Sequence, residues 1–130
     1  MDRKEVQPLN LLLRKGHQAL KALEEAIATD DGDKKSRHSL LLSFIFTFEM
    51  AIKCLIAALA ARGVSTPDYA VAVLKTGFQA EVIDDPATWD ALREYRNSGR
   101  HASQEEPALK DADLFRPHAV GVVNKVLIGL

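Results

Sequence analysis

Residues 40–59 form the stretch that most limits how this chain can fold, because they are apolar on nearly every side of a helix. Such a helix has to be covered all round, by neighbouring helices, by a partner or by lipid. Glu49 and Lys53 lie in the middle of it, and each charge would cost roughly 2.5–3.5 kcal/mol at the centre of a bilayer. We therefore predict the central helix of a bundle, with one face available for dimerisation and no membrane association.

Helical spacing of apolar residues divides the rest of the chain, and no strand-period alternation or internal repeat competes with it. A chain of 130 residues can bury a core without disulfides or metals, so we expect a single domain over residues 1–130. The fold class we predict is all-α, an antiparallel four-helix bundle with a short additional helix. The expected helices run from Pro8 to about Thr29, from Asp33 or Ser36 to about Arg62, from Pro67 to Thr76, from Pro86 to near Gly99, and from Leu114 to about Ile128.

Capping residues and glycines set these expected ends, since a hydroxyl or carboxylate starts a helix well and glycine accepts the positive φ that often follows one. Residues 78–83 are expected to add another turn or two of helix after the third element. The expected caps are Asp33 or Ser36, Ser65 or Thr66, Asp85 and Asp113, and the expected stops are Gly63, Gly77 and Gly99.

Overall charge gives no support for nucleic-acid or membrane binding, because the formal net charge is −1. An anion site would have to come from a local cluster of basic residues. Cys54 is the only cysteine, so no disulfide can form within the chain, which fits a reducing compartment. The first residues lead into no apolar run with a small-residue cleavage site. We therefore expect a cytoplasmic protein.

One cluster of usable chemistry follows the fourth helix, in the sequence Arg-Asn-Ser-Gly-Arg-His at residues 96–101. On a continuous helix Arg96 and His101 would be about 140° apart, but a helix ending near Gly99 would let the turn fold His101 back beside Arg96. Arginine fixes a phosphate bidentately and histidine exchanges protons near neutral pH. The pair would suit metal-independent RNA cleavage by the 2′-hydroxyl, with Asn97 donating to the phosphate and Arg100 binding the next one. The simpler interpretation is a basic helix end, which the helix dipole favours anyway.

Glu49 has two interpretations. It can form an ion pair with Lys53 one turn further along the central helix, which would hold the bundle together. It can instead lie under the Arg-His turn and orient Arg96 or His101.

The remaining candidate groups give no metal or cofactor site. His17, His38 and His118 have no carboxylate or histidine at metal-ligand spacing, so we predict no metal. No glycine-rich phosphate loop is present, so we predict no cofactor, and nucleotide binding by this chain alone is not expected.

Two segments together resemble HEPN domains. Residues 96–101 resemble their Arg-x4-His signature, and residues 44–53, Phe-Ile-Phe-Thr-Phe-Glu-Met-Ala-Ile-Lys, are similar to the segment "FEFTFELAWK" of the nucleotidyltransferase substrate-binding branch of that superfamily. The order of elements also fits, and the resemblance covers about residues 11–128.

This resemblance implies a HEPN-like bundle of four or five helices that forms homodimers and pairs with a minimal nucleotidyltransferase. Such pairs often act as toxin and antitoxin, in which the HEPN member is a ribonuclease that the transferase neutralises. It also implies that Arg96, Asn97 and His101 of both protomers meet in one cleft. Two functions stay open: a dimeric substrate-binding subunit whose cleft binds an anion or RNA, with Arg100 and Glu49 contributing, or a metal-independent endoribonuclease with Arg96 and His101 catalytic.

The chain departs from the family pattern in two places. Ser103 stands two residues after His101, where many paired members carry the tyrosine to which the transferase attaches adenylyl groups. Ile45 stands where the family segment has its first glutamate, and Ile52 where it has tryptophan. Inhibition by tight binding would not need the tyrosine.

Overall fold

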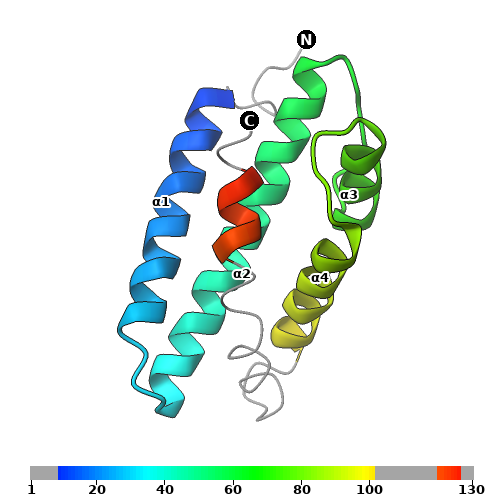
Figure 1. Cartoon of the computed structure of the whole chain (residues 1–130). Helices are drawn as coiled ribbons and strands as arrows, with labels where there is room; N and C mark the ends of the chain where they lie inside the picture. The colour runs from blue at the N-terminus through cyan, green and yellow to red at the C-terminus, as the bar shows by residue number, and fades with distance from the viewer. Residues whose placement is uncertain (1–8, 102–119, 127–130) are drawn as a thin grey trace.

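The computed structural model describes residues 9–101 and 120–126, and all regular structure within them is helical. Four helices follow in order, and a short helical segment covers residues 120–126 (Figure 1). The predicted all-α class is confirmed. The helices are α1 (Leu9–Ala28), α2 (Lys34–Ala61), α3 (Ala70–Gln79) and α4 (Pro86–His101).

α1 and α2 form a long antiparallel hairpin, and side-chain hydrogen bonds stabilise the turn between them. Asp33 caps α2, as predicted, with its carboxylate accepting a hydrogen bond of 2.7 Å from the backbone N–H of Ser36. The Nε of Arg37 reaches back 2.9 Å to Asp30. Gly63 follows the far end of α2 with a φ of 78°, which is the conformation predicted for it.

Two side chains of α2 also bond to the backbone of α1. The hydroxyl of Thr47, which is buried, lies 3.1 Å from the carbonyl oxygen of Ala19 and 2.7 Å from that of Ser43 in its own helix. The thiol of Cys54, whose residue is fully buried, lies 3.4 Å from the carbonyl oxygen of Leu12. These contacts satisfy the polar atoms of an otherwise apolar interface.

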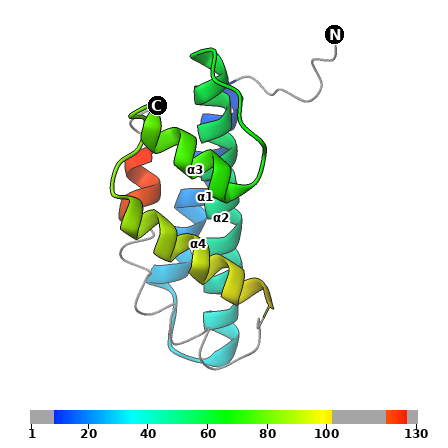
Figure 2. The same ribbon diagram turned by 90° about the vertical axis from the view of Figure 1, so that its right-hand side faces the viewer.

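α2 is the centre of the bundle, as its composition predicts. It contacts α1, α3 and α4, and Figure 2 shows α3 and α4 crossing it on the side that α1 leaves open. Of the described helices it alone has the length and hydropathy to cross a bilayer, and most of its large apolar residues are buried within the bundle. Its fully covered residues include Leu41, Phe48, Cys54, Leu55 and Leu59.

α3 differs from the prediction at both ends. Ser65 and Thr66 do not cap it, because the helix begins at Ala70 and the residue before it, Tyr69, makes no side-chain capping bond. Gly77 does not stop it, since the helix continues to Gln79. This glycine is buried, and a Cβ there would lie 3.2 Å from the side chains of Ile83 and Leu55. Gly77 therefore serves close packing and not chain reversal, a distinction that sequence spacing does not reveal.

α4 begins as predicted and ends later than predicted. The carboxylate of Asp85 accepts hydrogen bonds from the backbone N–H of Thr88 at 3.3 Å and from its hydroxyl at 2.8 Å. The helix then passes through Gly99 and reaches His101, so the predicted end near Gly99 is wrong. Glycine costs only about 1 kcal/mol inside a helix and need not end one.

The last predicted helix is confirmed where the structure describes it, over residues 120–126. Val123 and Val126 join the core. Its expected start at Asp113 and Leu114 lies outside the described residues, as do Ser103 and His118.

Candidate functional site

An aromatic cluster supports α4 on α2. The ring centroids of Phe44 and Tyr95 are 4.8 Å apart, those of Phe48 and Trp89 are 6.1 Å apart, and Phe44 and Phe48 are 6.1 Å apart along α2. Trp89 and Tyr95 are buried, so they are packing residues. The cluster fixes how the polar residues near the end of α4 face α2.

Arg96 lies on this cluster, and the side chains of Asn97, Phe48 and Glu49 are among those it contacts. Its Nε donates a hydrogen bond of 2.9 Å to Oδ1 of Asn97, and its guanidinium carbon is 5.1 Å from the centroid of the Phe48 ring. One guanidinium nitrogen is 3.9 Å from a carboxylate oxygen of Glu49. Only 13% of the Arg96 side chain is exposed. The guanidinium is therefore held in a defined position at the edge of the core.

Glu49 reaches Arg96 and not Lys53. Within the described residues we find no ion pair between Glu49 and Lys53, and Lys53 points outward as an exposed residue. The distance of 3.9 Å from Glu49 to Arg96 is too long for a hydrogen bond, so this contact is an electrostatic attraction between carboxylate and guanidinium. Of the two interpretations of Glu49, this geometry favours the one in which it orients Arg96.

Arg100 and His101 occupy the last turn of α4. Because the helix is continuous, the backbone positions of residues 96 and 101 are separated by about 140° around its axis. The predicted turn that would bring His101 back beside Arg96 is wrong, and one protomer does not pair these positions by that route. The assignment of Arg96, Asn97, Arg100, His101 and Glu49 to a functional site stays a prediction.

An exposed apolar stripe runs along α2 next to Glu49. Leu42 and Phe46 are 52% and 56% exposed, and their spacing of four places them on one face of the helix, with Glu49 at the next position of that face. Large apolar side chains exposed in a row are typical of an interface.

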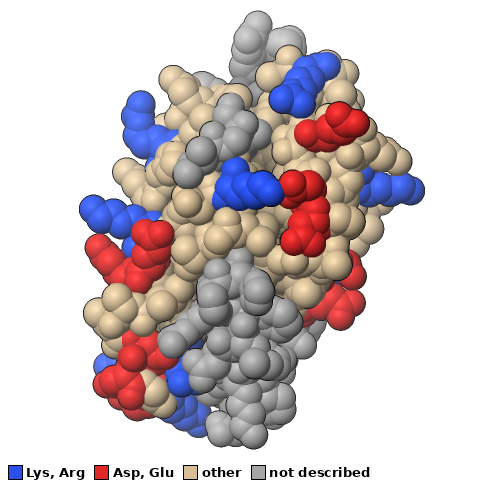
Figure 3. All heavy atoms as spheres, in the orientation of Figure 1, with Lys and Arg blue, Asp and Glu red and all other residues tan. Residues whose placement is uncertain are grey.

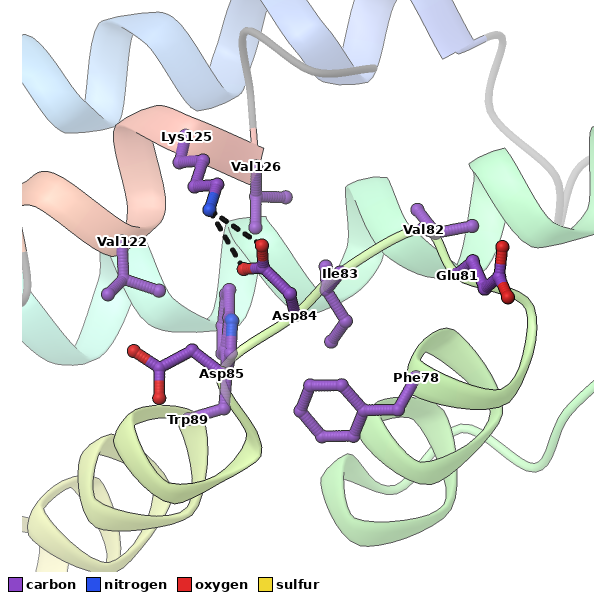
Figure 4. Close-up of a pocket in the computed structure, with 10 residues that line it drawn as sticks. All are labelled: Phe78, Glu81, Val82, Ile83, Asp84, Asp85, Trp89, Val122, Lys125 and Val126. Carbon is purple, nitrogen blue, oxygen red and sulfur yellow. Dashed lines mark hydrogen bonds and ion pairs between the residues drawn. The ribbon is translucent and has the colours of Figure 1, made fainter.

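A cavity of about 320 Å³ lies at the other end of α4, and sequence reasoning missed it. We call it the Trp89 cavity. Phe78, Ile83, Trp89 and Val126 line its apolar part, and its charged residues are Glu81, Asp84, Asp85 and Lys125 (Figure 4). The only sequence feature that marks this cavity is the pair Asp84-Asp85 before Trp89. The opposite wall of the cavity comes from residues 120–126, which lie far along the chain.

Charge on the face seen in Figure 3 is mixed, with basic and acidic side chains interspersed. Among the described residues, no three His, Cys, Asp or Glu side chains lie close enough together to hold a metal ion.

Comparison with known proteins gives a match to a protein family. No curated protein matches the chain. A protein-family model described as nucleotidyltransferase substrate binding protein like matches residues 12–114.

Proposed function

The chain belongs to the family described as nucleotidyltransferase substrate binding protein like, and from this we propose that it is the cytoplasmic partner subunit of a minimal nucleotidyltransferase. The observation that carries the proposal is the extent of the family match, which includes nearly all of α1 and the whole of α2, α3 and α4. The family name associates such chains with a nucleotidyltransferase. We further propose that the chain forms a homodimer and that a cleft between the two copies binds an anion.

In the proposed dimer two copies meet over the exposed stripe of α2, at Leu42 and Phe46. Covering these side chains would remove apolar surface from water, which favours association by about 25 cal/mol per Å² before the entropic cost of association is subtracted. Because Glu49 lies on the same face and 3.9 Å from Arg96, the two guanidinium groups would be brought toward the interface. The cleft between the copies would then contain two Arg96 side chains, one from each copy.

The proposed cleft binds an anion, such as an RNA phosphate, through Arg96. Support comes from the way its side chain is held, since a preorganised guanidinium loses little freedom on binding a phosphate. With its oxygen accepting from Arg96, Asn97 would turn its amide nitrogen toward the ligand as a donor. Glu49 would keep Arg96 in place, and Arg100 would add charge.

The alternative function is a metal-independent ribonuclease that the transferase neutralises as an antitoxin. In this alternative Arg96 of one copy would work with His101 of the other, since α4 continues through both positions without the turn that would fold one back on the other. In that reaction His101 would act as general acid or base and Arg96 would stabilise charge on the phosphorus centre.

The partner proposal is tested by co-expressing the chain with the minimal nucleotidyltransferase encoded nearest to its gene and measuring the mass of the complex by light scattering. We expect a stable complex that contains two copies of this chain. Separate elution of the two proteins at micromolar concentration would contradict the proposal. Phe46→Ser is the matched variant, expected to release single copies of this chain while its helical content stays unchanged.

The ribonuclease alternative is tested with the purified protein, RNA and excess chelator, comparing the natural chain with His101→Ala and Arg96→Ala. Cleavage that both substitutions abolish would establish the nuclease. Equal background in all three would leave the binding subunit as the function.

A further inference from the structure

The Trp89 cavity combines an apolar floor with an acidic rim. Trp89 is 2% exposed and forms part of the floor, while the carboxylate of Asp84 lies beyond one edge of its ring, that of Asp85 lies beside it, and that of Glu81 lies at the far side of the pocket (Figure 4). A volume of about 320 Å³ is at the lower limit for ligand pockets. It holds one long side chain or a small fragment and is too small for a nucleotide.

The charge of the rim decides which class of ligand fits. The lining carries three carboxylates and one ammonium group, that of Lys125, so its net charge is negative and would repel a phosphate or other anion. A cation with an apolar stem would be attracted, because its stem could cover the apolar floor while its head stays at the carboxylates. Lysine and arginine side chains have this construction.

A lysine of this chain already shows how the rim binds a cation. The ammonium group of Lys125 lies 2.8 and 2.9 Å from the two carboxylate oxygens of Asp84, and both side chains are 68% exposed. Exposed ion pairs of this kind contribute little to stability, because water screens them. An incoming basic group can therefore displace Lys125 at small cost.

The surroundings of the cavity favour a protein as the source of that basic group. Phe78 separates the Trp89 cavity from a second one of about 420 Å³ between α3 and α4, whose apolar lining includes Leu74 and Pro86. Val71, which is 52% exposed, borders this second cavity. A free amine would leave this adjoining apolar surface in water, whereas a protein partner would cover it.

We propose that the Trp89 cavity is the docking point for a lysine or arginine side chain of the nucleotidyltransferase partner. The identity of the partner rests on the proposed function, while the chemistry of the cavity rests on its own residues. The basic head would bind Asp84 and Asp85 in place of Lys125, and the stem would lie against Trp89. The site is on the opposite end of α4 from Arg96, so the partner could be bound while the cleft stays accessible.

The chemistry of the cavity is tested first, with small probes. Trp89 is the only tryptophan of the chain, so its fluorescence reports this cavity alone. The probes are N-acetyl-arginine amide and its neutral counterpart N-acetyl-citrulline amide. We expect a saturable change in emission with the arginine probe and binding about tenfold weaker with citrulline, since one charged hydrogen bond is lost.

Three variants sharpen this measurement. Asp84→Asn should weaken binding of the arginine probe about tenfold, and Lys125→Met should tighten it because the internal competitor is removed. Glu94→Gln removes one negative charge from an exposed site on α4 outside the cavity and should leave binding unchanged. Equal binding of both probes, no saturable response, or equal weakening in the Glu94→Gln control would overturn the proposal.

The partner is tested next, by measuring the affinity of the nucleotidyltransferase for the natural chain, Asp84→Asn and Glu94→Gln. We expect Asp84→Asn alone to lose about tenfold in affinity. Equal affinity for all three would overturn this docking site and leave the proposed function intact. Failure of the natural chain to bind the transferase would overturn the proposed function and the identity of the occupant, whatever the probes show.

Discussion

At its N-terminal end α4 lies beside the carboxylates of Asp84 and Asp85 above a cavity, whereas near its C-terminal end it carries Arg96 above the ring of Phe48. The helix dipole favours acids at the first end and bases at the second, each by about 0.3–1 kcal/mol. Folding alone could therefore place these charges. The two ends differ in what lies beneath the charged groups. At the N-terminal end there is a cavity, whereas near the C-terminal end the guanidinium of Arg96 rests on the ring of Phe48.

Phe48 connects the two ends, because its ring contacts Trp89 on one side and lies under Arg96 on the other. Phe48→Ala is expected to have the largest effect of the changes considered, a loss of about 3–5 kcal/mol in the free energy of unfolding, measured by urea denaturation. Phe46→Ala is the matched control on the same helix. Its side chain is 56% exposed, so the loss in a single copy should stay within about 0.5 kcal/mol. Equal losses would show that Phe48 does not link the ends.

Cys54 gives an independent readout of the same change. Burial raises the pKa of its thiol to about 11, so the protonated, unreactive form dominates at pH 8 in the folded protein. Alkylation by iodoacetamide at pH 8 should therefore be slow in the natural chain and follow unfolding. The rate should rise in Phe48→Ala and stay low in Phe46→Ala, and rapid alkylation of the natural chain would contradict the burial of Cys54.

The N-terminal end is expected to depend on Asp85 more through its backbone than through its charge. Asp85 caps α4 with a φ of 61°, a conformation that alanine adopts poorly. Asp85→Ala should cost about 1–2 kcal/mol in unfolding free energy, while Asp85→Asn should cost little because asparagine caps well and accepts this φ. Asp85→Gly separates the causes, since it loses the cap but relieves the strain. Equal stability of the alanine and glycine variants would exclude a backbone contribution.

The C-terminal end is expected to depend on the planar shape of Arg96. Arg96→Lys keeps the charge but loses the flat contact with Phe48 and the Nε that donates to Asn97, so we expect a loss of about 0.5–1 kcal/mol in thermal or urea unfolding. Arg93→Lys is the comparison, because Arg93 pairs with exposed Asp90 and lies on no aromatic ring among the described residues. A larger loss at Arg93 would reverse the contrast.

The smallest expected effect is that of Lys125→Met, below about 0.5 kcal/mol in unfolding free energy, because its ion pair with Asp84 is exposed. Stability that is unchanged, together with tighter binding of a basic probe, would separate the role of this lysine in binding from its role in folding. A loss above about 1 kcal/mol would show instead that the pair fastens residues 120–126 to the bundle.

The sequence predicted the helices and their order because each carries its own signal. Apolar residues all round α2 indicated its central place, and Asp33 and Asp85 marked helix starts through side chains that bond only nearby backbone. The prediction was wrong at Gly77 and Gly99, where glycine was taken as a stop. Whether a glycine ends a helix depends on its neighbours in space, such as Ile83 and Leu55 around Gly77.

The candidate site was predicted less completely for the same reason. Sequence left two interpretations of Glu49 open, and the crossing of α2 and α4 is what brings its carboxylate near Arg96. The return of His101 to Arg96 assumed a turn that does not form. The Trp89 cavity joins residues 78–89 to residues 122–126, a juxtaposition to which no local pattern points.

The bonds from α2 to α1 have a consequence for how this molecule could transmit a signal. Their donors, Thr47 and Cys54, are seven residues apart, and so are their acceptors, Ala19 and Leu12, in the opposite direction. A slide of α1 along α2 by one turn, about 5.4 Å, would break both bonds at once. The two bonds therefore fix the register of the hairpin, so we expect α1 and α2 to move as one unit.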